Sequence, residues 1–296
     1  MLVNNLMNEI GFTKDEQNKY YEYKNLIGTR MDSYAEDFMR GKLSFNEVLD
    51  KVHKFQSCGL HQYTIDLLFV LECTSFLLEK YESNGISKKI FIDAMKDIKY
   101  KVEECIRVKN IFGIFVVKWY EKFLDLKRIA LGRLQYDIST YNGDAITINN
   151  YTIHEGDFVL WCHIPSSGPL NPELCIESFK MAYDFFADKL NNGILPIMCC
   201  SWLLYPQYRE VFGEKSNIAN FKSNFEIIDV QNKEKFDEMW RVFGVECDSI
   251  DINDLPSNTT MQKNFIQYMK KGYSFGVATG FILFDGENVL TKNNNK

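Results

Sequence analysis

The sequence contains no proline before Pro165, although it has six prolines in all. Proline disrupts helix interiors and central strands, so its absence over this length is compatible with long uninterrupted helices. All six prolines lie between Pro165 and Pro256. The asymmetry indicates that the chain changes architecture partway along its length.

Cysteine pairs with C-x-x-C spacing and long apolar runs are also missing. The eight cysteines include no C-x-x-C pair, so most are expected to be small buried side chains in a reducing compartment. The most apolar windows are short, and "IDLLFVLECTSFLL" contains Asp66 and Glu72. No membrane span is expected, and the polar start "MLVNNLMNEIGF" lacks the pattern of a signal peptide. These features predict a cytoplasmic protein that does not associate with membranes.

An excess of positive charge is lacking as well. The formal net charge is −6, and Lys and Arg form no stripe of the kind that binds nucleic acid. Nucleic acid is therefore not an expected partner. With 46% hydrophobic and 25% charged residues, the 296-residue chain is globular and long enough for two domains.

Helical patterns fill the first part of the chain. Thr13 with Glu16 and Ser44 with Glu47 have the capping-box spacing, in which a hydroxyl and a carboxylate satisfy the free N–H groups of a first helical turn. Glycines or Asn-Gly separate most of the segments that follow. We predict helices over 13–27, 30–40, 44–55, 60–80, 88–106 and 109–127.

After Arg128 the hydrophobic period changes to two. "LGRLQYDI" alternates, with Arg133, Gln135 and Asp137 on one face, and Asn142-Gly143 predicts a hairpin that returns through "AITI". "DFVLWCHI" is apolar on both faces and should be a central strand. The remaining predicted elements are a helix over 172–190, the strand "ILPIMCCSWLL", a short helix near 206–212, the strand "FEIIDV", the helix "KEKFDEMWRVF" and the strand "YSFGVATGFILF".

These patterns predict an α+β protein. An all-helical N-terminal domain, residues 1–127, precedes a mixed β-sheet flanked by helices, residues 128–296. The strands at 158–164 and 194–204 are joined by a helix, so they should run parallel.

The junction "HIPSSGPLNPE" links the strand ending at His163 to the helix that starts at Pro172. Asn171 is a suitable cap and proline suits the first helical position. Ser166, Ser167, Gly168 and Leu170 lead to a helix N-terminus at the carboxyl end of a strand, where open α/β sheets bind anionic ligands. Proline removes donors here and Glu173 adds negative charge. A structural turn and a ligand site therefore both remain open.

Several stretches resemble a bacterial two-domain acyltransferase family, with a helical N-acyltransferase N-terminal domain and a GNAT-like C-terminal domain. They are "DIKYKVEEC", "GIFVVKWY", "LGRLQYD", "HIPSSGPL", "CSWLLYP" and "SNIANF". In GNAT-type enzymes the acyl-CoA lies between two splayed parallel strands. The resemblance implies transfer of an acyl group from a thioester donor to a small amine or hydroxyl acceptor.

The pyrophosphate signature of GNAT enzymes is only partly present. Its pattern is Gln or Arg, two residues, Gly, one residue, and Gly or Ala. Aligned on Gly168, the chain has Pro165 at the first position and Leu170 at the last. Either the loop formed by Ser166, Ser167, Gly168, Leu170 and Asn171 binds the donor in a modified way, or donor binding is lost. The donor could be acyl-CoA or an acyl-carrier protein, and no tightly bound cofactor or metal is expected.

His163 is the residue best suited to act as a general base, because its ordinary pKa allows proton transfer near neutrality. A histidine that only fixes the strand end is the alternative. Cys200 and Ser201 end the next parallel strand and point to opposite faces, so one of them could lie near His163 as a nucleophile. A zinc site that uses Cys162, His163, Cys199 or Cys200 is less favoured, since neighbours on a strand point to opposite faces.

Three further side chains could take part in the reaction. Tyr205 follows the same strand, where GNAT enzymes often place a tyrosine that protonates the thiolate; Tyr205 and Tyr208 could equally be packing residues. Arg133 and Gln135 could contact a substrate or could simply lie on an exposed sheet face. The alternatives to an acyltransferase are a non-catalytic GNAT-like binding or regulatory module and a hydrolase that uses Cys200 or Ser201.

Overall fold

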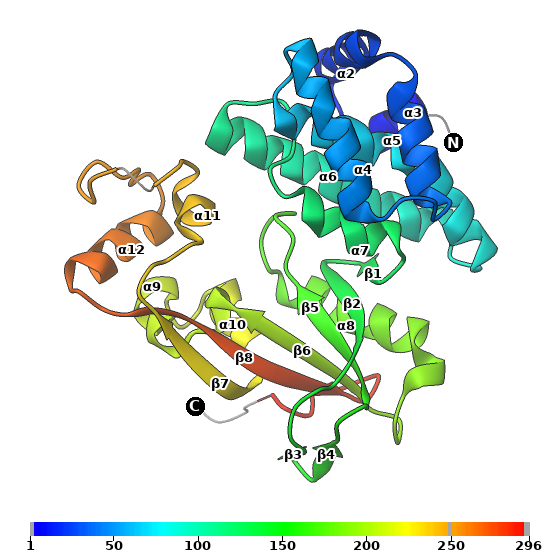
Figure 1. The fold of residues 1–296 in the computed structure, drawn as a ribbon. Coiled ribbons are helices and arrows are strands. Elements are labelled where there is room, and N and C mark those ends of the chain that lie inside the picture. The colour runs from blue at the N-terminus through cyan, green and yellow to red at the C-terminus, as the bar shows by residue number, and fades with distance from the viewer. Residues whose placement is uncertain (1–2, 248–249, 293–296) are drawn as a thin grey trace. The chain divides into compact units, whose positions relative to one another are not determined.

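The computed structural model describes residues 3–247 and 250–292. The chain forms two compact units, a helical unit (Met1–Ala130) and a sheet unit (Leu131–Lys296), and each is described by itself. The helical unit is drawn in blue to green in Figure 1. Its elements are α1 (Val3–Glu9), α2 (Lys14–Ile27), α3 (Arg30–Met39), α4 (Phe45–Val52), η1 (His53–Cys58), α5 (Gln62–Ser83), α6 (Lys88–Lys109), η2 (Val117–Tyr120) and α7 (Glu121–Leu124).

Helix α5 is the centre of the helical unit. Leu67, Leu68, Phe69, Val70 and Leu71 follow one another along it, and all five are buried. A helix that is apolar on every side is stable only when other helices surround it. Helices α1, α3, α4 and α6 pack on α5, as expected for such a helix.

The sequence predicted most of these helices, and both capping boxes are confirmed. The hydroxyls of Thr13 and Ser44 accept hydrogen bonds from the backbone of Glu16 and Glu47, whose carboxylates return the bond to the cap. The additional helix α1 was not predicted. Helix α4 is shorter than predicted, because the chain changes to the 3-10 helix η1 at His53.

The predicted helix over 109–127 is wrong. Asn110 adopts a left-handed φ of 54° and ends α6. The following segment instead docks its backbone on the first turn of α5, where Ile114 N donates to Tyr63 O at 2.9 Å. A β-carbon on Gly113 would lie 2.4 Å from the Tyr63 backbone, so this close approach requires glycine. Only the short helices η2 and α7 follow.

The sheet unit contains a six-stranded mixed sheet in the order β1-β2-β5-β6-β8-β7. Strands β5 and β6 are parallel, as predicted, and lie at the centre of the sheet, while β2–β5, β6–β8 and β7–β8 are antiparallel (Figure 1). The α+β fold class is therefore confirmed. The strands are β1 (Arg128–Leu131), β2 (Leu134–Thr140), β5 (Phe158–His163), β6 (Leu195–Ser201), β7 (Glu226–Lys233) and β8 (Phe275–Phe284).

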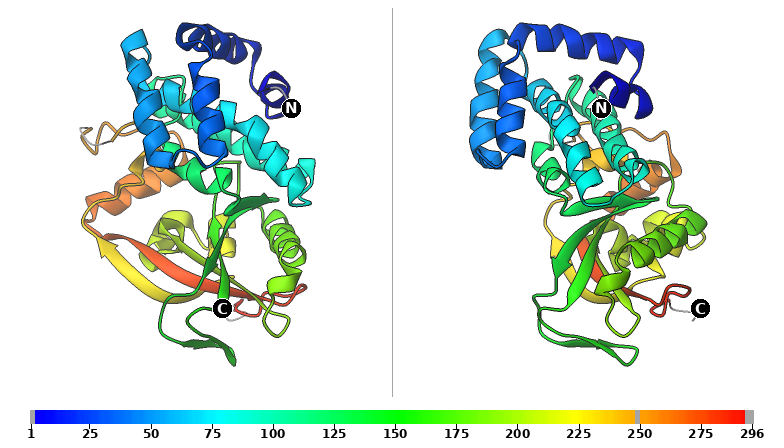
Figure 2. Two further views of the ribbon diagram at one scale, coloured as in Figure 1. Left: turned by 45° about the vertical axis from the view of Figure 1, so that its right-hand side comes forward. Right: turned by 90° about the vertical axis from the view of Figure 1, so that its right-hand side faces the viewer.

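Two strand predictions need correction. "LGRLQYDI" is not one strand, because Gly132 takes a φ of 67° and turns the chain between β1 and β2. "AITI" does not return to the main sheet. Strand β3 (Ile146–Ile148) pairs with β4 (Tyr151–Ile153) in a separate hairpin that extends away from the sheet (Figures 1 and 2). Asn149 and Asn150 have positive φ angles of 47° and 65°, which gives the tight turn of this hairpin.

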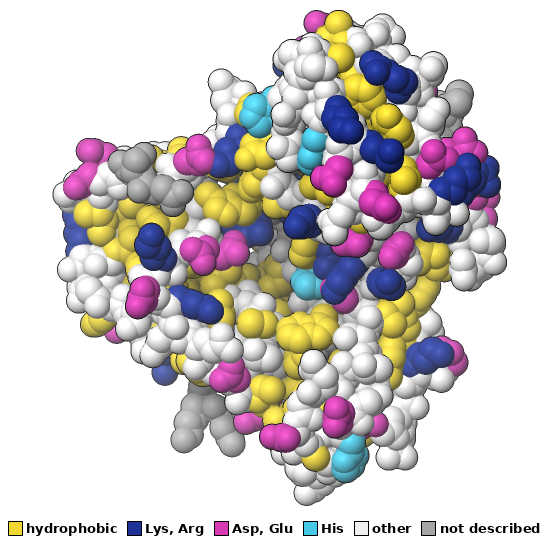
Figure 3. All heavy atoms as spheres, in the orientation of Figure 1, with side chains coloured by type: hydrophobic (Ala, Val, Ile, Leu, Met, Phe, Trp, Pro, Cys, Tyr) yellow, Lys and Arg dark blue, Asp and Glu magenta, His cyan; other side chains and the backbone are white. Residues whose placement is uncertain are grey.

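Helices of the sheet unit pack on the strands and form a lobe beside them. Helix α8 (Pro172–Phe185) covers one face of the sheet, where Phe179 contacts Phe284. A second cluster gathers aromatic rings around Tyr208, and hydrophobic side chains of this lobe are visible at the surface in Figure 3. The other helices are η3 (Ala187–Lys189), η4 (Trp202–Leu204), η5 (Pro206–Tyr208), α9 (Arg209–Phe212), α10 (Asn217–Lys222), α11 (Met239–Phe243) and α12 (Thr260–Lys270).

The sequence predicted these helices unevenly. The short helix near 206–212 is confirmed as η5 and α9, while the predicted helix "KEKFDEMWRVF" is reduced to α11 because β7 extends to Lys233. Helices α10 and α12 were missed. Thr259 and Gln262 form a capping box at the start of α12, a signal that the sequence contains.

Ser178 joins α8 to the first turn of the sheet. Its buried hydroxyl donates to Leu131 O, accepts from Leu134 N at 3.3 Å and lies 2.8 Å from the hydroxyl of Tyr136. We expect Ser178→Ala to lower the free energy of unfolding by about 2–3 kcal/mol, since each buried polar group without a partner costs about 1–3 kcal/mol. Urea unfolding measures this change. Ser139→Ala is the control, and an equal loss in both variants would contradict the assignment.

Candidate active site

The central parallel strands separate near their carboxyl ends. The ladder between β5 and β6 pairs Leu160 with Ile197 and Trp161 with Met198 and ends there. Strand β5 nevertheless stays paired with β2 up to its last residue, His163, and β6 stays paired with β8 to its own end. The two strands therefore part at the position where the GNAT resemblance places the acyl donor.

The register assigns the candidate residues to faces of the sheet. Side chains alternate along a strand, and Trp161 is paired with Met198, so His163 and Cys200, each two residues further on, lie on the same face. Ser201 lies on the opposite face, which α8 covers. The sequence left open which of Cys200 and Ser201 shares a face with His163, and the register selects Cys200.

His163 is paired with a carboxylate. Its Nε2 lies 3.0 Å from Oδ2 of Asp137 on the neighbouring strand β2. The side chain of Asp137 is 4% exposed and that of His163 is 25% exposed. A buried carboxylate beside an imidazole fixes the ring orientation and the tautomer and stabilises the protonated ring. The pairing is compatible with the general-base role predicted for His163, and that role stays a prediction.

Sequence reasoning had placed Asp137 on a strand face with Arg133 and Gln135, but it had not paired Asp137 with His163. The pairing depends on the β2–β5 register, in which His163 is opposite Gln135 and Asp137 is two residues away on the same face. Gln135 is buried beside the pair, so the exposed sheet face considered for it is not what the structure shows. Its predicted contact with substrate stays a prediction.

The other predicted catalytic residues are placed differently. The Ser201 hydroxyl accepts a hydrogen bond from Leu203 N at 3.2 Å and caps η4. Tyr205 is buried, and its hydroxyl donates to Oδ1 of Asn232 at 2.5 Å, while burial raises its pKa. Cys200 is exposed at the end of β6. Of the other three residues predicted as catalytic, only Cys200 shares a sheet face with His163.

Buried thiols lie on the face of the sheet opposite His163. Cys162 and Cys199 are adjacent there, and burial raises the pKa of Cys162 well above its ordinary value. Cys175 of α8 is close to them, and burial raises its pKa to about 11. The raised pKa values disfavour the thiolate forms of Cys162 and Cys175. Within residues 3–247 and 250–292, no three His, Cys, Asp or Glu side chains form a group that could hold a metal ion.

The loop between β5 and α8 is held through its backbone carbonyl groups, and the helix that follows it is capped. The guanidinium of Arg133 donates to carbonyl groups of Pro165, Gly168 and Pro169. Oδ1 of Asn171 accepts hydrogen bonds from the first turn of α8. Ser166 and Gly168 are exposed, Ser167 is half-buried and the side chain of Leu170 is buried. Their binding of a donor stays a prediction.

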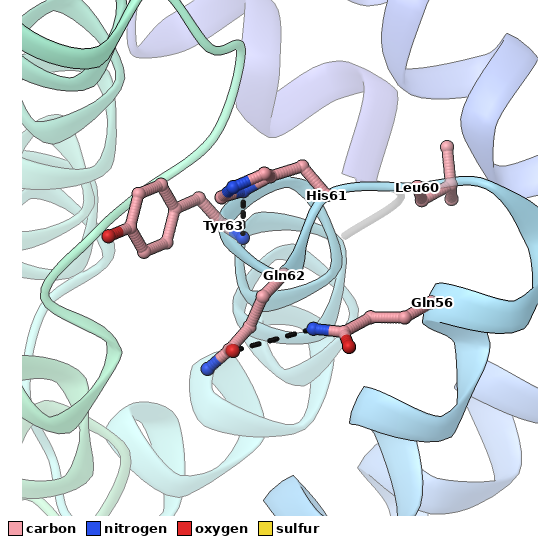
Figure 4. Close-up of a pocket in the computed structure, with 5 residues that line it drawn as sticks. All are labelled: Gln56, Leu60, His61, Gln62 and Tyr63. Carbon is pink, nitrogen blue, oxygen red and sulfur yellow. Dashed lines mark hydrogen bonds between the residues drawn. The ribbon is translucent and has the colours of Figure 1, made fainter.

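The helical unit has a surface pocket of about 410 Å³ at the N-terminus of α5 (Figure 4). Its lining is mostly polar. His61 accepts a hydrogen bond from Tyr63 N at 3.1 Å and so caps the helix, and Gln56 donates to Gln62. The residues that line the pocket are Gln56, Leu60, His61, Gln62 and Tyr63.

Another histidine pair stabilises the helical unit. His53 Nε2 lies 2.6 Å from Oδ1 of buried Asp66 on α5. Burial raises the pKa of Asp66 to about 6, although the hydrogen bond from His53 opposes the shift. The pair joins η1 to α5.

Comparisons with known families agree with the fold. Residues 1–126 match the N-acyltransferase N-terminal domain, and residues 129–282 match the GNAT-like C-terminal domain. The chain therefore belongs to the two-domain acyltransferase family with a GNAT-like C-terminal domain. No curated protein matches the sequence.

Solved acyltransferase structures share this fold over nearly the whole chain. One, in complex with decanoyl-CoA and teicoplanin, is 18% identical with a TM-score of 0.65, and the match covers 96% of this chain and 99% of that one. A mutant acyltransferase in complex with octanoyl-CoA is 18% identical with a TM-score of 0.64, with coverage of 95% and 99%. A third, with CoA and 10C-teicoplanin, is 17% identical at a TM-score of 0.64, with the same coverage.

Among the described residues, no helix is both long and apolar enough to cross a membrane. On the face shown in Figure 3, acidic and basic side chains are interspersed.

Proposed function

We propose that the chain transfers the acyl group of an acyl-CoA to an amine or hydroxyl group of a small-molecule acceptor. The family supplies the reaction class, acyl transfer. The observation that carries the proposal is the His163–Asp137 pair, which lies just beyond the point where β5 and β6 part. The pair supports a general base next to the position at which a GNAT-like fold binds its thioester.

Acyl-CoA is favoured over an acyl-carrier protein as the donor. The solved structures that share the fold hold decanoyl-CoA, octanoyl-CoA or CoA, and two of them also hold teicoplanin or its acylated form. These ligands support a medium-chain acyl-CoA as the first donor to test. They also support an acceptor of the size of a natural product, bearing a nucleophilic amine or hydroxyl.

The pair can perform the proton transfer that the reaction needs. The nucleophilic nitrogen or oxygen of the acceptor attacks the thioester carbonyl carbon, a new bond to that carbon forms, and the carbon–sulfur bond breaks. In the tautomer whose Nε2–H donates to Asp137, the lone pair of His163 is on Nδ1 and takes the proton of the acceptor. The Asp137 carboxylate stabilises the resulting imidazolium. His163 then returns this proton to the departing thiolate, and CoA leaves as the thiol.

A variant of Cys200 distinguishes this mechanism from that of a hydrolase with a cysteine nucleophile. It shares a sheet face with His163, but direct attack by the acceptor requires no enzyme nucleophile. We expect Cys200→Ala to keep kcat within about threefold of wild type, whereas loss of a covalent nucleophile would lower it by orders of magnitude. The measurement is the rate of CoA release. A variant as inactive as one lacking His163 would favour an acyl-cysteine intermediate.

Donor binding is the first test of the proposal. At a concentration about 100 times its Kd, a ligand of the native state stabilises the protein by about 2.7 kcal/mol. We therefore expect CoA and decanoyl-CoA to raise Tm by several degrees, while adenosine alone raises it little. If no acyl-CoA of any chain length changes Tm, the proposed function is wrong and a binding module without a CoA donor is favoured.

A further inference from the structure

The loop from β5 to α8 is held by one arginine from the turn between β1 and β2. Arg133 Nε donates to Pro169 O at 3.1 Å, Nη1 to Pro165 O at 3.1 Å and Nη2 to Gly168 O at 2.6 Å. Arg133 is 8% exposed. Three hydrogen bonds from one charged, planar group fix the loop far more firmly than one contact would.

These hydrogen bonds determine the direction of two backbone N–H groups in the loop. In a trans peptide unit the N–H is directed opposite to the C=O, and the chain has no cis peptide bonds among its described residues. Carbonyls turned toward Arg133 therefore turn the N–H groups of Ser166 and Leu170 away from it. In the part of the chain that the structure describes, the backbone N–H groups of Ser167, Gly168 and Leu170 have no protein acceptor.

The helix that follows the loop has used its own first donors. Pro172 has no N–H, and the Asn171 side chain accepts from Glu173 N at 2.8 Å and from Leu174 N at 3.4 Å. An anion at this junction must therefore be bound by the loop rather than by the first turn of α8. Gly168 has a φ of 99° and open space around its α-carbon, so the loop turns here through a conformation that favours glycine.

We propose that Arg133 is the positioning residue of the donor loop: it holds residues 165–170 so that the N–H groups of Ser167, Gly168 and Leu170 face the diphosphate of CoA. This inference rests on the proposed function and explains how a loop with Pro165 and Leu170 at the signature positions binds an acyl-CoA. Arg133 thus acts through the loop and not by contact with the acyl acceptor.

The test is the Kd of CoA, measured by calorimetry on the full chain. We expect Arg133→Met to raise the Kd at least about tenfold, because loss of three charge-assisted hydrogen bonds releases the loop. Arg133→Lys keeps the charge but cannot reach three carbonyls, so an increase of about three- to tenfold is expected. Decanoyl-pantetheine, which lacks the diphosphate, should bind wild type and both variants with Kd values within about twofold.

Ser178→Ala is the matched control, because it weakens the packing of α8 against the same turn without touching the loop carbonyls. Its Tm should fall, but its Kd for CoA should stay within about twofold of wild type. A folded Arg133→Lys variant with the wild-type Kd for CoA would overturn the assignment even if Arg133→Met does not fold. Equal weakening of CoA and decanoyl-pantetheine would also overturn it. Failure of the wild-type chain to bind CoA would instead overturn the proposed function itself.

Discussion

Replacement of His163 by alanine is expected to lower kcat by about 10²–10⁴-fold, the range that a positioned general base contributes. The KM for acyl-CoA should change little, because the imidazole acts on the acceptor proton and not on the CoA diphosphate. Steady-state CoA release, followed over pH, measures both parameters. The rising limb of the wild-type pH profile should be absent in the variant, since the group that must lose its proton is gone.

Asp137→Asn tests whether the carboxylate supports His163. The amide has nearly the same shape but cannot stabilise a protonated ring, so kcat should fall by about 10–100-fold. The double variant should be no worse than His163→Ala alone, since the two side chains act as a unit. His154→Ala is the matched control, because His154 is exposed beside β4. Activity of His163→Ala within threefold of this control would remove the base from the mechanism.

Gly113→Ala is expected to destabilise the helical unit by about 3 kcal/mol or more. A β-carbon at this position would lie 2.4 Å from both the carbonyl carbon and oxygen of Tyr63 and 2.7 Å from Thr64 N. All three atoms belong to the backbone of the α5 N-terminus, which cannot yield as a flexible side chain can. The measurement is the free energy of unfolding from urea titration.

Gly59→Ala is the control for the Gly113 variant. Gly59 has a left-handed φ of 81°, but a β-carbon there would meet no atom within 4 Å. It should cost only about 1–2 kcal/mol, the strain of a left-handed residue. If Gly113→Ala costs no more than Gly59→Ala, the segment after α6 does not pack on α5 as closely as the structure shows.

Local signals in the sequence predicted much of the fold. The capping boxes at Thr13 and Ser44 identified two helix starts, and the apolar run over 158–163 identified the central strand. These signals are reliable because the capping residues or apolar run lie within a few residues of the helix start or strand that they specify. The same is true of Asn171 and Pro172, which begin α8 as predicted.

The errors arose where distant contacts decide the conformation. Residues 109–127 contain enough apolar side chains to suggest a helix. Packing of Gly113 and the hydrogen bond of Ile114 on the backbone of Tyr63 stabilise a different conformation there. The return of "AITI" to the main sheet was predicted from Asn142-Gly143, while the tighter turn at Asn149 and Asn150 determines the pairing.

The candidate site could be predicted only in part, for the same reason. His163 and the loop around Gly168 were chosen from their residue types and their place at the end of a strand. Asp137 could be assigned only from the register between β2 and β5, which no local pattern specifies. Arg133 was predicted to contact a substrate. Its three hydrogen bonds to the loop depend on the turn between β1 and β2, where the sequence pattern predicted a continuous strand.

A crystal structure of the chain with bound decanoyl-CoA tests the central claim most directly. We predict that the pantetheine arm lies between β5 and β6 beyond Trp161 and Met198, with the diphosphate on the N–H groups of Ser167, Gly168 and Leu170 and the thioester within reach of His163. A ligand bound elsewhere, with β5 and β6 paired without interruption to their ends, would contradict it.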